Sequence, residues 1–340
     1  PPTDLVVEEL ETEVAGVKMV LFEAYGDAED EIDIYFPDLK HVHGSETIQG
    51  ETFPNLYTLR GTKYRDLVKW YGGVDNLLFY ARKSDSYSHS HMRSWVGNEF
   101  IVERITNYRD AIQYVHDQSI RHMNQCATQE ELVELVILPD QLSNDPWLQE
   151  FYGSVAHVVR NIYIGYLGWY SGDATELAKP SFERRAKLYI SAMGGRDNIL
   201  SLANQAIENE DYGWAMDILT YLIRVNPKDS AARNMKSLAM REWGYDQANI
   251  YYRNFALSGA AELDGSLDRS GAFNFANPVI VKQFSIGTIL ENLRVKIDNK
   301  KAENADFKVG FNIVDLDESY GFHIRNGIAA FYDYIPEDPD

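Results

Sequence analysis

The sequence predicts an α+β protein in which a strand-rich segment, an all-helical segment and a short mixed segment follow one another. Residues 5–36 contain short apolar or alternating runs, residues 98–262 carry apolar side chains at helical spacing, and residues 278–340 return to alternation after one helix. We therefore expect domains at residues 1–97, 98–262 and 278–340, joined by a linker at 263–277. The length of 340 residues leaves room for these cores.

The first segment is predicted to contain strands and one helix. Residues 17–22 and 31–36 alternate or run apolar, as sheet strands do. Apolar side chains at Tyr64, Leu67 and Tyr71 have helical spacing, and the apolar run at residues 76–81 indicates another strand. This order places the histidine-containing stretch at residues 88–99 at the end of a strand, just before a long helix.

The second segment is predicted to be all-helical. One face of its first helix is marked by Phe100, Ile101, Ile105, Tyr108, Ile112 and Val115. A capping box from Thr128 to Glu131 opens another helix, and Gly194 with Gly195 ends a later one. The pattern at residues 212–215 recurs loosely at 244–248, which suggests tetratricopeptide-like hairpins within this domain.

The last segment follows a stretch rich in Gly, Ser, Asn and Asp, which is typical of a linker. A helix is expected at residues 286–295, and alternation at 307–314 and 321–324 predicts strands.

Composition excludes several classes of function. The net charge of −20 argues against nucleic-acid and anionic-membrane partners, because both need a basic surface. Cys126 is the single cysteine, so an intrachain disulfide is impossible. No run of 18 apolar residues occurs, so no membrane span is predicted.

Several motifs resemble those of a known family. In chain order they are Tyr-Phe-Pro-Asp-Leu-Lys at 35–40, Glu46, Tyr-Thr-Leu-Arg-Gly at 57–61, Ser-His-Ser-His-Met-Arg-Ser-Trp-Val-Gly at 88–97, His-Asp-Gln at 116–118 and Gly-Tyr-Leu-Gly-Trp-Tyr at 165–170. Their order and spacing resemble the alkylsulfatases of the metallo-β-lactamase superfamily, the linear alkyl-sulfate hydrolases that have a dimerisation domain and a sterol-carrier-like tail.

The resemblance implies an identity for each segment. Residues 1–97 would be the C-terminal part of an αββα metallo-β-lactamase-like domain, residues 98–262 the helical dimerisation domain, and residues 278–340 the start of a sterol-carrier-like domain. The family's upstream His-x-His-x-Asp-His motif, which supplies most ligands of two metal ions, does not occur in this sequence. We therefore expect the chain to be a portion of a longer enzyme, with an incomplete metal site.

The resemblance also implies site residues. Glu46 and His91 match metal ligands of a two-zinc site, and Asp27 stands where the family has a longer Glu. Arg60 matches the arginine that holds the sulfate, and a guanidinium fork suits two oxygens of such an anion. The cations Lys63 and Arg65 would add positive charge that attracts an alkyl sulfate.

Ordinary structural roles remain open for these residues. Glu46 could cap a turn, Arg60 could pair with a surface carboxylate, and His91 could be a surface histidine, since Met92 replaces the family's second histidine there. The remaining histidines, such as His116 and His157, are expected to make buried hydrogen bonds.

The expected activity is zinc-dependent hydrolysis of alkyl sulfate esters to an alcohol and inorganic sulfate, by a homodimer. The alternatives are a non-catalytic dimeric scaffold derived from the same family and a carrier of apolar ligands.

Overall fold

The computed structural model describes residues 4–59, 61, 63–268 and 277–339. The chain divides into two compact units, Pro1–Leu267 and Asp268–Asp340. Each unit contains helices and a β-sheet, which confirms the predicted mixed class. The predicted boundary at residue 97 stays a prediction, because the first unit continues through it.

Within the described part of the first unit, a six-stranded sheet has its strands in chain order. All neighbouring pairs are antiparallel except β4 and β5, which run parallel. A parallel pair needs a crossover connection, and here the crossover contains helix α1 (Leu67–Ala81). The strands are β1 (Glu9–Val14), β2 (Val17–Glu23), β3 (Ile32–Phe36), β4 (His41–Gly44), β5 (Ser86–His89) and β6 (Trp95–Val96).

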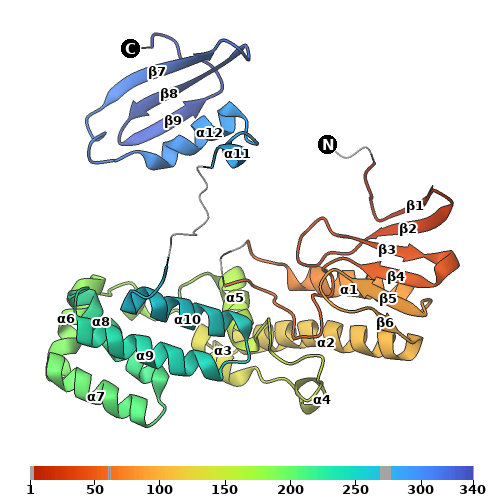
Figure 1. Cartoon of the computed structure of the whole chain (residues 1–340), viewed down its shortest axis with the longest axis horizontal. Coiled ribbons are helices and arrows are strands. Elements are labelled where there is room, and N and C mark those ends of the chain that lie inside the picture. Colours follow the sequence, from red (N-terminus) through yellow and green to blue (C-terminus); the bar gives the residue numbers. More distant parts are fainter. Residues whose placement is uncertain (1–3, 60, 62, 269–276, 340) are drawn as a thin grey trace. The chain divides into compact units, whose positions relative to one another are not determined.

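The two faces of this sheet differ in burial. Because successive side chains alternate between faces, Phe22, Val42 and Tyr87 all point to one face of the sheet, and all three are buried. This face packs on α1 and on α2 (Asn98–Met123) (Figure 1). Leu21 and Ile34 lie opposite each other in the register and remain partly exposed on the other face. The sheet therefore buries one face well and the other only in part.

The predicted strand at residues 76–81 is wrong, because these residues form the second half of α1. A short apolar run fits a buried helix as well as a strand. The buried side chains of α1 recur at Trp70, Val74, Leu77 and Ala81, which is helical spacing.

The helical part confirms the predicted caps and the long first helix. Ile101, Ile105, Ile112 and Val115 of α2 are buried. The capping box at Thr128 is present, and α6 ends just before two glycines with positive φ. The remaining helices are α3 (Gln129–Leu135), α4 (Asp140–Ser143), α5 (Val155–Leu167), α6 (Phe182–Ala192), α7 (Arg196–Glu208), α8 (Tyr212–Val225), α9 (Ser230–Asp246) and α10 (Ile250–Asp264).

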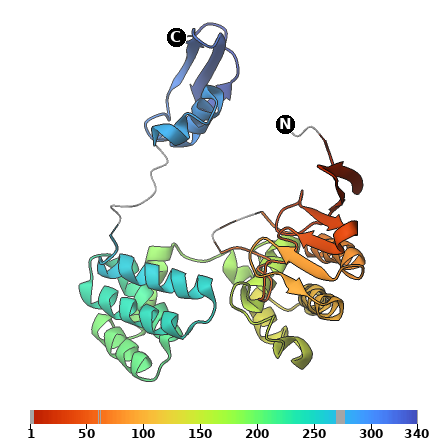
Figure 2. The same ribbon diagram turned by 45° about the vertical axis from the view of Figure 1, so that its right-hand side comes forward.

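Helices α7 to α10 pack side by side as two hairpins (Figure 1, Figure 2). The recurrence of the pattern at residues 212–215 in residues 244–248 is only approximate in the structure. Ala215 is buried in the first turn of α8, whereas Ala248 is exposed in the turn before α10. The first copy of the pattern begins α8, whereas the second copy begins in the last turn of α9, which is longer than α8. No described helix is long and apolar enough to cross a membrane.

The second unit contains a short helix α11 (Pro278–Val281), then α12 (Ile286–Leu293), and a three-stranded antiparallel sheet. Its strands are β7 (Asp306–Ile313), β8 (Glu318–Arg325) and β9 (Ile328–Tyr332). The helix and the first two strands confirm the prediction. Strand β9 was not predicted, although Asn326 and Gly327, both with positive φ, form the two-residue turn that this pair of residues favours.

Candidate functional site at the β4–β5 edge

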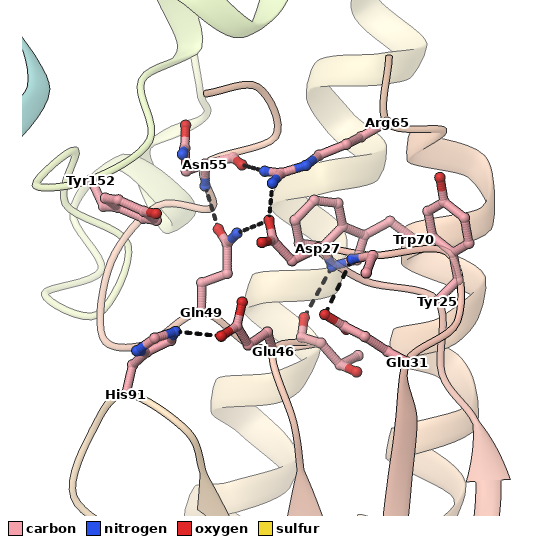
Figure 3. A network of polar contacts seen from close by, with 12 residues as sticks. Tyr25, Asp27, Glu31, Glu46, Gln49, Asn55, Arg65, Trp70, His91 and Tyr152 are labelled. Carbon is pink, nitrogen blue, oxygen red and sulfur yellow. Dashed lines mark hydrogen bonds and ion pairs between the residues drawn. The ribbon is translucent and has the colours of Figure 1, made fainter. Parts of the chain in front are cut away.

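Glu46 and His91 meet at one edge of the first sheet because β4 and β5 run parallel and in register. Gly44 pairs with His89 at the ends of these strands, and each site residue follows its strand end by two positions. His91 Nε2 lies 2.9 Å from Glu46 Oε1 (Figure 3). The His91 and Glu46 side chains are 53% and 36% exposed, so the pair is open to a further ligand.

A second group of polar side chains lies beside this pair. Gln49 Nε2 donates to Asp27 Oδ1 at 2.9 Å, and the Asn55 backbone N–H donates to Gln49 Oε1 at 2.7 Å. Arg65 closes the chain of contacts: its guanidinium donates to Asn55 O at 2.7 Å and forms an ion pair with Asp27 (Figure 3). Asp27 is therefore already bound to two donors.

Burial raises the pKa values of three acids, Asp27, Glu31 and Asp33, in the same part of the structure as Glu46 and His91. It raises the pKa of Asp27, an effect that Arg65 opposes and that the nearby Glu46 strengthens. Burial also raises the pKa of Glu31 to about 8 and that of Asp33 to about 7. Asp33 Oδ1 accepts from the Ser45 backbone N–H at 2.8 Å, so this acid also orients the segment that carries Glu46.

The predicted sulfate-binding cations have different surroundings. Arg60 lies outside the described residues. Lys63 is exposed. Arg65 is only 7% exposed and is held by Asp27 and Asn55, so it contributes little to an exposed positive surface. The expected positive patch around Lys63 and Arg65 is therefore not formed by these two residues together.

The other histidines are mostly held by neighbouring side chains. His157 Nε2 lies 3.3 Å from Asn55 Oδ1, which is the buried hydrogen bond expected of it. His116 Nε2 lies 2.9 Å from Tyr166 Oη in a bond that is only partly buried. His89 is buried between the rings of Tyr87 and Trp95, and burial lowers its pKa to about 4. It therefore packs as a neutral aromatic ring and does not join His91 at the surface.

The loop that carries Gln49 and Asn55 is fixed by the helical part of the same unit. The Phe53 N–H donates to Gln149 O at 2.9 Å, and the Gly153 N–H donates to Phe53 O at 3.1 Å. Asn249 Nδ2 donates to the backbone carbonyls of residues 150, 152 and 153 at 3.0–3.1 Å. The sequence analysis did not predict these contacts. The local signal that could have pointed to Asn249 is its place just before α10, because Asn is a favoured N-cap residue.

A zinc site takes three or four protein ligands. Glu46 and His91 offer two donors, while Asp27 is bound to Arg65 and Gln49. In the part of the chain that the structure describes, no group of three His, Cys, Asp or Glu side chains is placed to hold a metal ion. These residues alone do not fit a complete zinc site.

Comparisons with known proteins identify the family. The family model described as alkyl sulfatase dimerisation matches residues 128–266, and the one described as alkyl sulfatase C-terminal matches residues 274–340. A linear primary-alkylsulfatase from Pseudomonas sp. is 38% identical over 337 residues. The chain belongs to the alkylsulfatase family.

Other alkylsulfatase relatives are more distant but match nearly the same length. The alkyl/aryl-sulfatase BDS1 of Saccharomyces cerevisiae is 26% identical and is aligned over 100% of this chain. The solved structure of the inverting sec-alkylsulfatase Pisa1 from Pseudomonas sp. matches 100% of the chain with a TM-score of 0.88 at 25% identity. The chain spans 63% of the first relative, 52% of BDS1 and 54% of Pisa1.

Proposed function

We propose that the chain is part of an alkylsulfatase that hydrolyses alkyl sulfate esters to an alcohol and inorganic sulfate. The contact between Glu46 and His91 is the observation that carries this proposal. The alkylsulfatase family supplies the reaction class, and the paired carboxylate and imidazole supply the donor types that zinc prefers. In this proposal Glu46 and His91 are metal ligands, and the other ligands come from outside the described residues.

The sheet supports the proposal that more sequence belongs to this domain. Leu21, Ile34 and Phe36 lie on the partly exposed face of this sheet. An apolar sheet face gains free energy by packing against another layer. We assign this sheet to one half of an αββα metallo-β-lactamase sandwich, and the second unit to the start of a sterol-carrier-like domain.

The cations have separate roles in this proposal. Arg60 binds the sulfate oxygens through its planar guanidinium fork, and Lys63 adds exposed positive charge in a strongly acidic chain. Arg65 holds Asp27 and Asn55 and thereby orders the loop next to Glu46.

Zinc content and sulfate release test the proposal. The 340-residue chain by itself should retain fewer than two equivalents of zinc and should not hydrolyse dodecyl sulfate. Co-expression with a segment that carries the His-x-His-x-Asp-His motif should restore both. In that complex Glu46→Gln should lower zinc content, whereas His122→Ala, in the last turn of α2, should leave it unchanged. Arg60→Ala should lower turnover and leave zinc bound.

Two results would contradict the proposal. The first is two retained zinc equivalents together with turnover in the chain alone, which would show that the site needs no further ligands. The second is a stable complex with neither zinc nor activity. That outcome would favour the non-catalytic dimeric scaffold, which the dimerisation match also supports. Apolar-ligand carriage by the second unit is the remaining alternative.

A further inference from the structure

A groove lies beside α6, far along the chain from Glu46 and His91. One wall is a face of α6, and the other is the segment at residues 174–180, which includes the short helix η2 (Ala174–Glu176). Its volume is about 680 Å³, within the range of about 300–1,000 Å³ that is usual for small-molecule sites. The apolar part of the lining comes from Ala178, Pro180, Leu188, Tyr189 and Ala192.

Arg185 is the cation in this lining that has no ion-pair partner among the described residues. Its Nε atom is buried and has no hydrogen-bond partner among the described residues. Its guanidinium carbon lies 5.2 Å from the centre of the Phe182 ring. The other cation of the lining, Lys179, already has Glu176 at 3.6 Å. Arg185 is thus free to bind an anion at the groove.

Arg224 lies near Arg185, and Lys236 lies near Arg224. Arg224 of α8 packs on the same Phe182 ring, with its guanidinium carbon 4.1 Å from the ring centre. Lys236 of α9 donates to Thr220 Oγ1 at 2.6 Å. None of these three cations forms an ion pair with a carboxylate in the described part of the chain.

This cluster is unusual for a chain with a net charge of −20. Burial and the nearby Arg224 both lower the pKa of Lys236, while Asp217 acts in the opposite direction without forming an ion pair. Arg185 and Arg224, which are held against the Phe182 ring, repel each other, and an anion bound beside them would relieve that repulsion. The cluster is therefore suited to bind an oxyanion.

We propose that this groove binds a long-chain anionic amphiphile, with its alkyl chain along Leu188 and Tyr189 and its charged head against Arg185. Stacking of Tyr189 on Tyr221, with ring centres 4.8 Å apart, fixes the apolar wall. A small anion without an alkyl chain would leave the apolar wall at Leu188 and Tyr189 exposed to water. A neutral lipid would leave Arg185 without an anionic partner. Sulfate, sulfonate and carboxylate heads share the oxyanion that a guanidinium binds. This site lies apart from the proposed catalytic edge and requires no hydrolysis.

Calorimetric titration of the full 340-residue chain with decanesulfonate tests the proposal, because its carbon–sulfur bond is not a sulfate ester. Decanoate should compete for the same site, whereas methanesulfonate and decanol should not. Arg185→Ala should weaken decanesulfonate binding about tenfold or more, as expected for loss of a charged hydrogen-bond partner. Ala178→Trp should weaken it by filling the groove.

Arg184→Ala is the matched control, since Arg184 is the exposed neighbour on α6 that does not line the groove. It should bind decanesulfonate as the unchanged chain does. The proposal would be overturned if Arg185→Ala and Ala178→Trp bound decanesulfonate as tightly as the unchanged chain does. Decanol binding as tight as that of decanesulfonate would also overturn it. Light scattering on the same variants tests whether a second copy of the chain occupies the groove instead. A shift in dimer dissociation with unchanged decanesulfonate affinity would assign the groove to a protein interface.

Discussion

Replacing Asn249 tests whether the helical hairpins hold the loop beside Glu46. This side chain is 5% exposed. Its amide nitrogen donates to three backbone carbonyls at residues 150, 152 and 153, and its Oδ1 accepts from the N–H groups of Tyr251 and Tyr252 at the start of α10. Asn249→Ala removes a helix cap worth about 1 kcal/mol and leaves buried carbonyls unpaired at a cost of about 1–3 kcal/mol. We expect a loss of about 2–4 kcal/mol in the free energy of unfolding.

Urea unfolding followed by tryptophan fluorescence measures this loss, because all six tryptophans lie in the first unit. The midpoint should fall with little change in slope. Asn226→Ala is the control: Asn226 is exposed at the end of α8 and its side chain accepts one bond, from the Lys228 N–H. It should lose less than about 1 kcal/mol. Equal small losses in both variants would refute the proposed role of Asn249.

Three further predictions follow. Gly153→Ala should destabilise the first unit in the same urea assay, because a Cβ there would lie 2.0 Å from Pro54 O, whereas Gly213→Ala, in open space on α8, should be neutral or stabilising. Burial lowers the pKa of His157 from 6.5 to about 4, so stability should be lost as pH falls from about 6.5 to about 4, by roughly 3 kcal/mol from this group. His157→Gln should lack this loss, and an unchanged acid slope would disprove the assignment. Light scattering at micromolar concentration should report a homodimer through residues 98–262, as the dimerisation match suggests, and a stable monomer would contradict it.

Local patterns predicted much of the secondary structure. The face of α2, the Thr128 capping box and the strands at residues 17–22 and 31–36 were predicted correctly because each depends on spacing within one segment. The run at 76–81 was misassigned because an apolar run does not distinguish a buried strand from a buried helix. Only packing of Leu77 and Ala81 against the sheet side of the core decides that question.

The candidate site shows the same division. Motif order in the sequence pointed to Glu46, His91 and Asp27, but not to their partners. Glu46 and His91 are 45 residues apart, and the parallel register of β4 and β5 brings them together. Arg65 was predicted to add positive charge that attracts the substrate, whereas in the structure it is buried against Asp27 and Asn55.

The sequence by itself determined the mixed fold class, the Thr128 capping box, the glycine stop after α6, the absence of an intrachain disulfide and the alkylsulfatase resemblance. The tertiary structure alone decided which polar groups meet, which are desolvated and which charges lack a partner. Capping and periodicity act over a few neighbouring residues, so sequence order records them directly. Burial of Asp33, the carbonyl contacts of Asn249 and burial of the unpartnered Nε atom of Arg185 arise from segments far apart in sequence. Their energies depend on the packed arrangement of those segments.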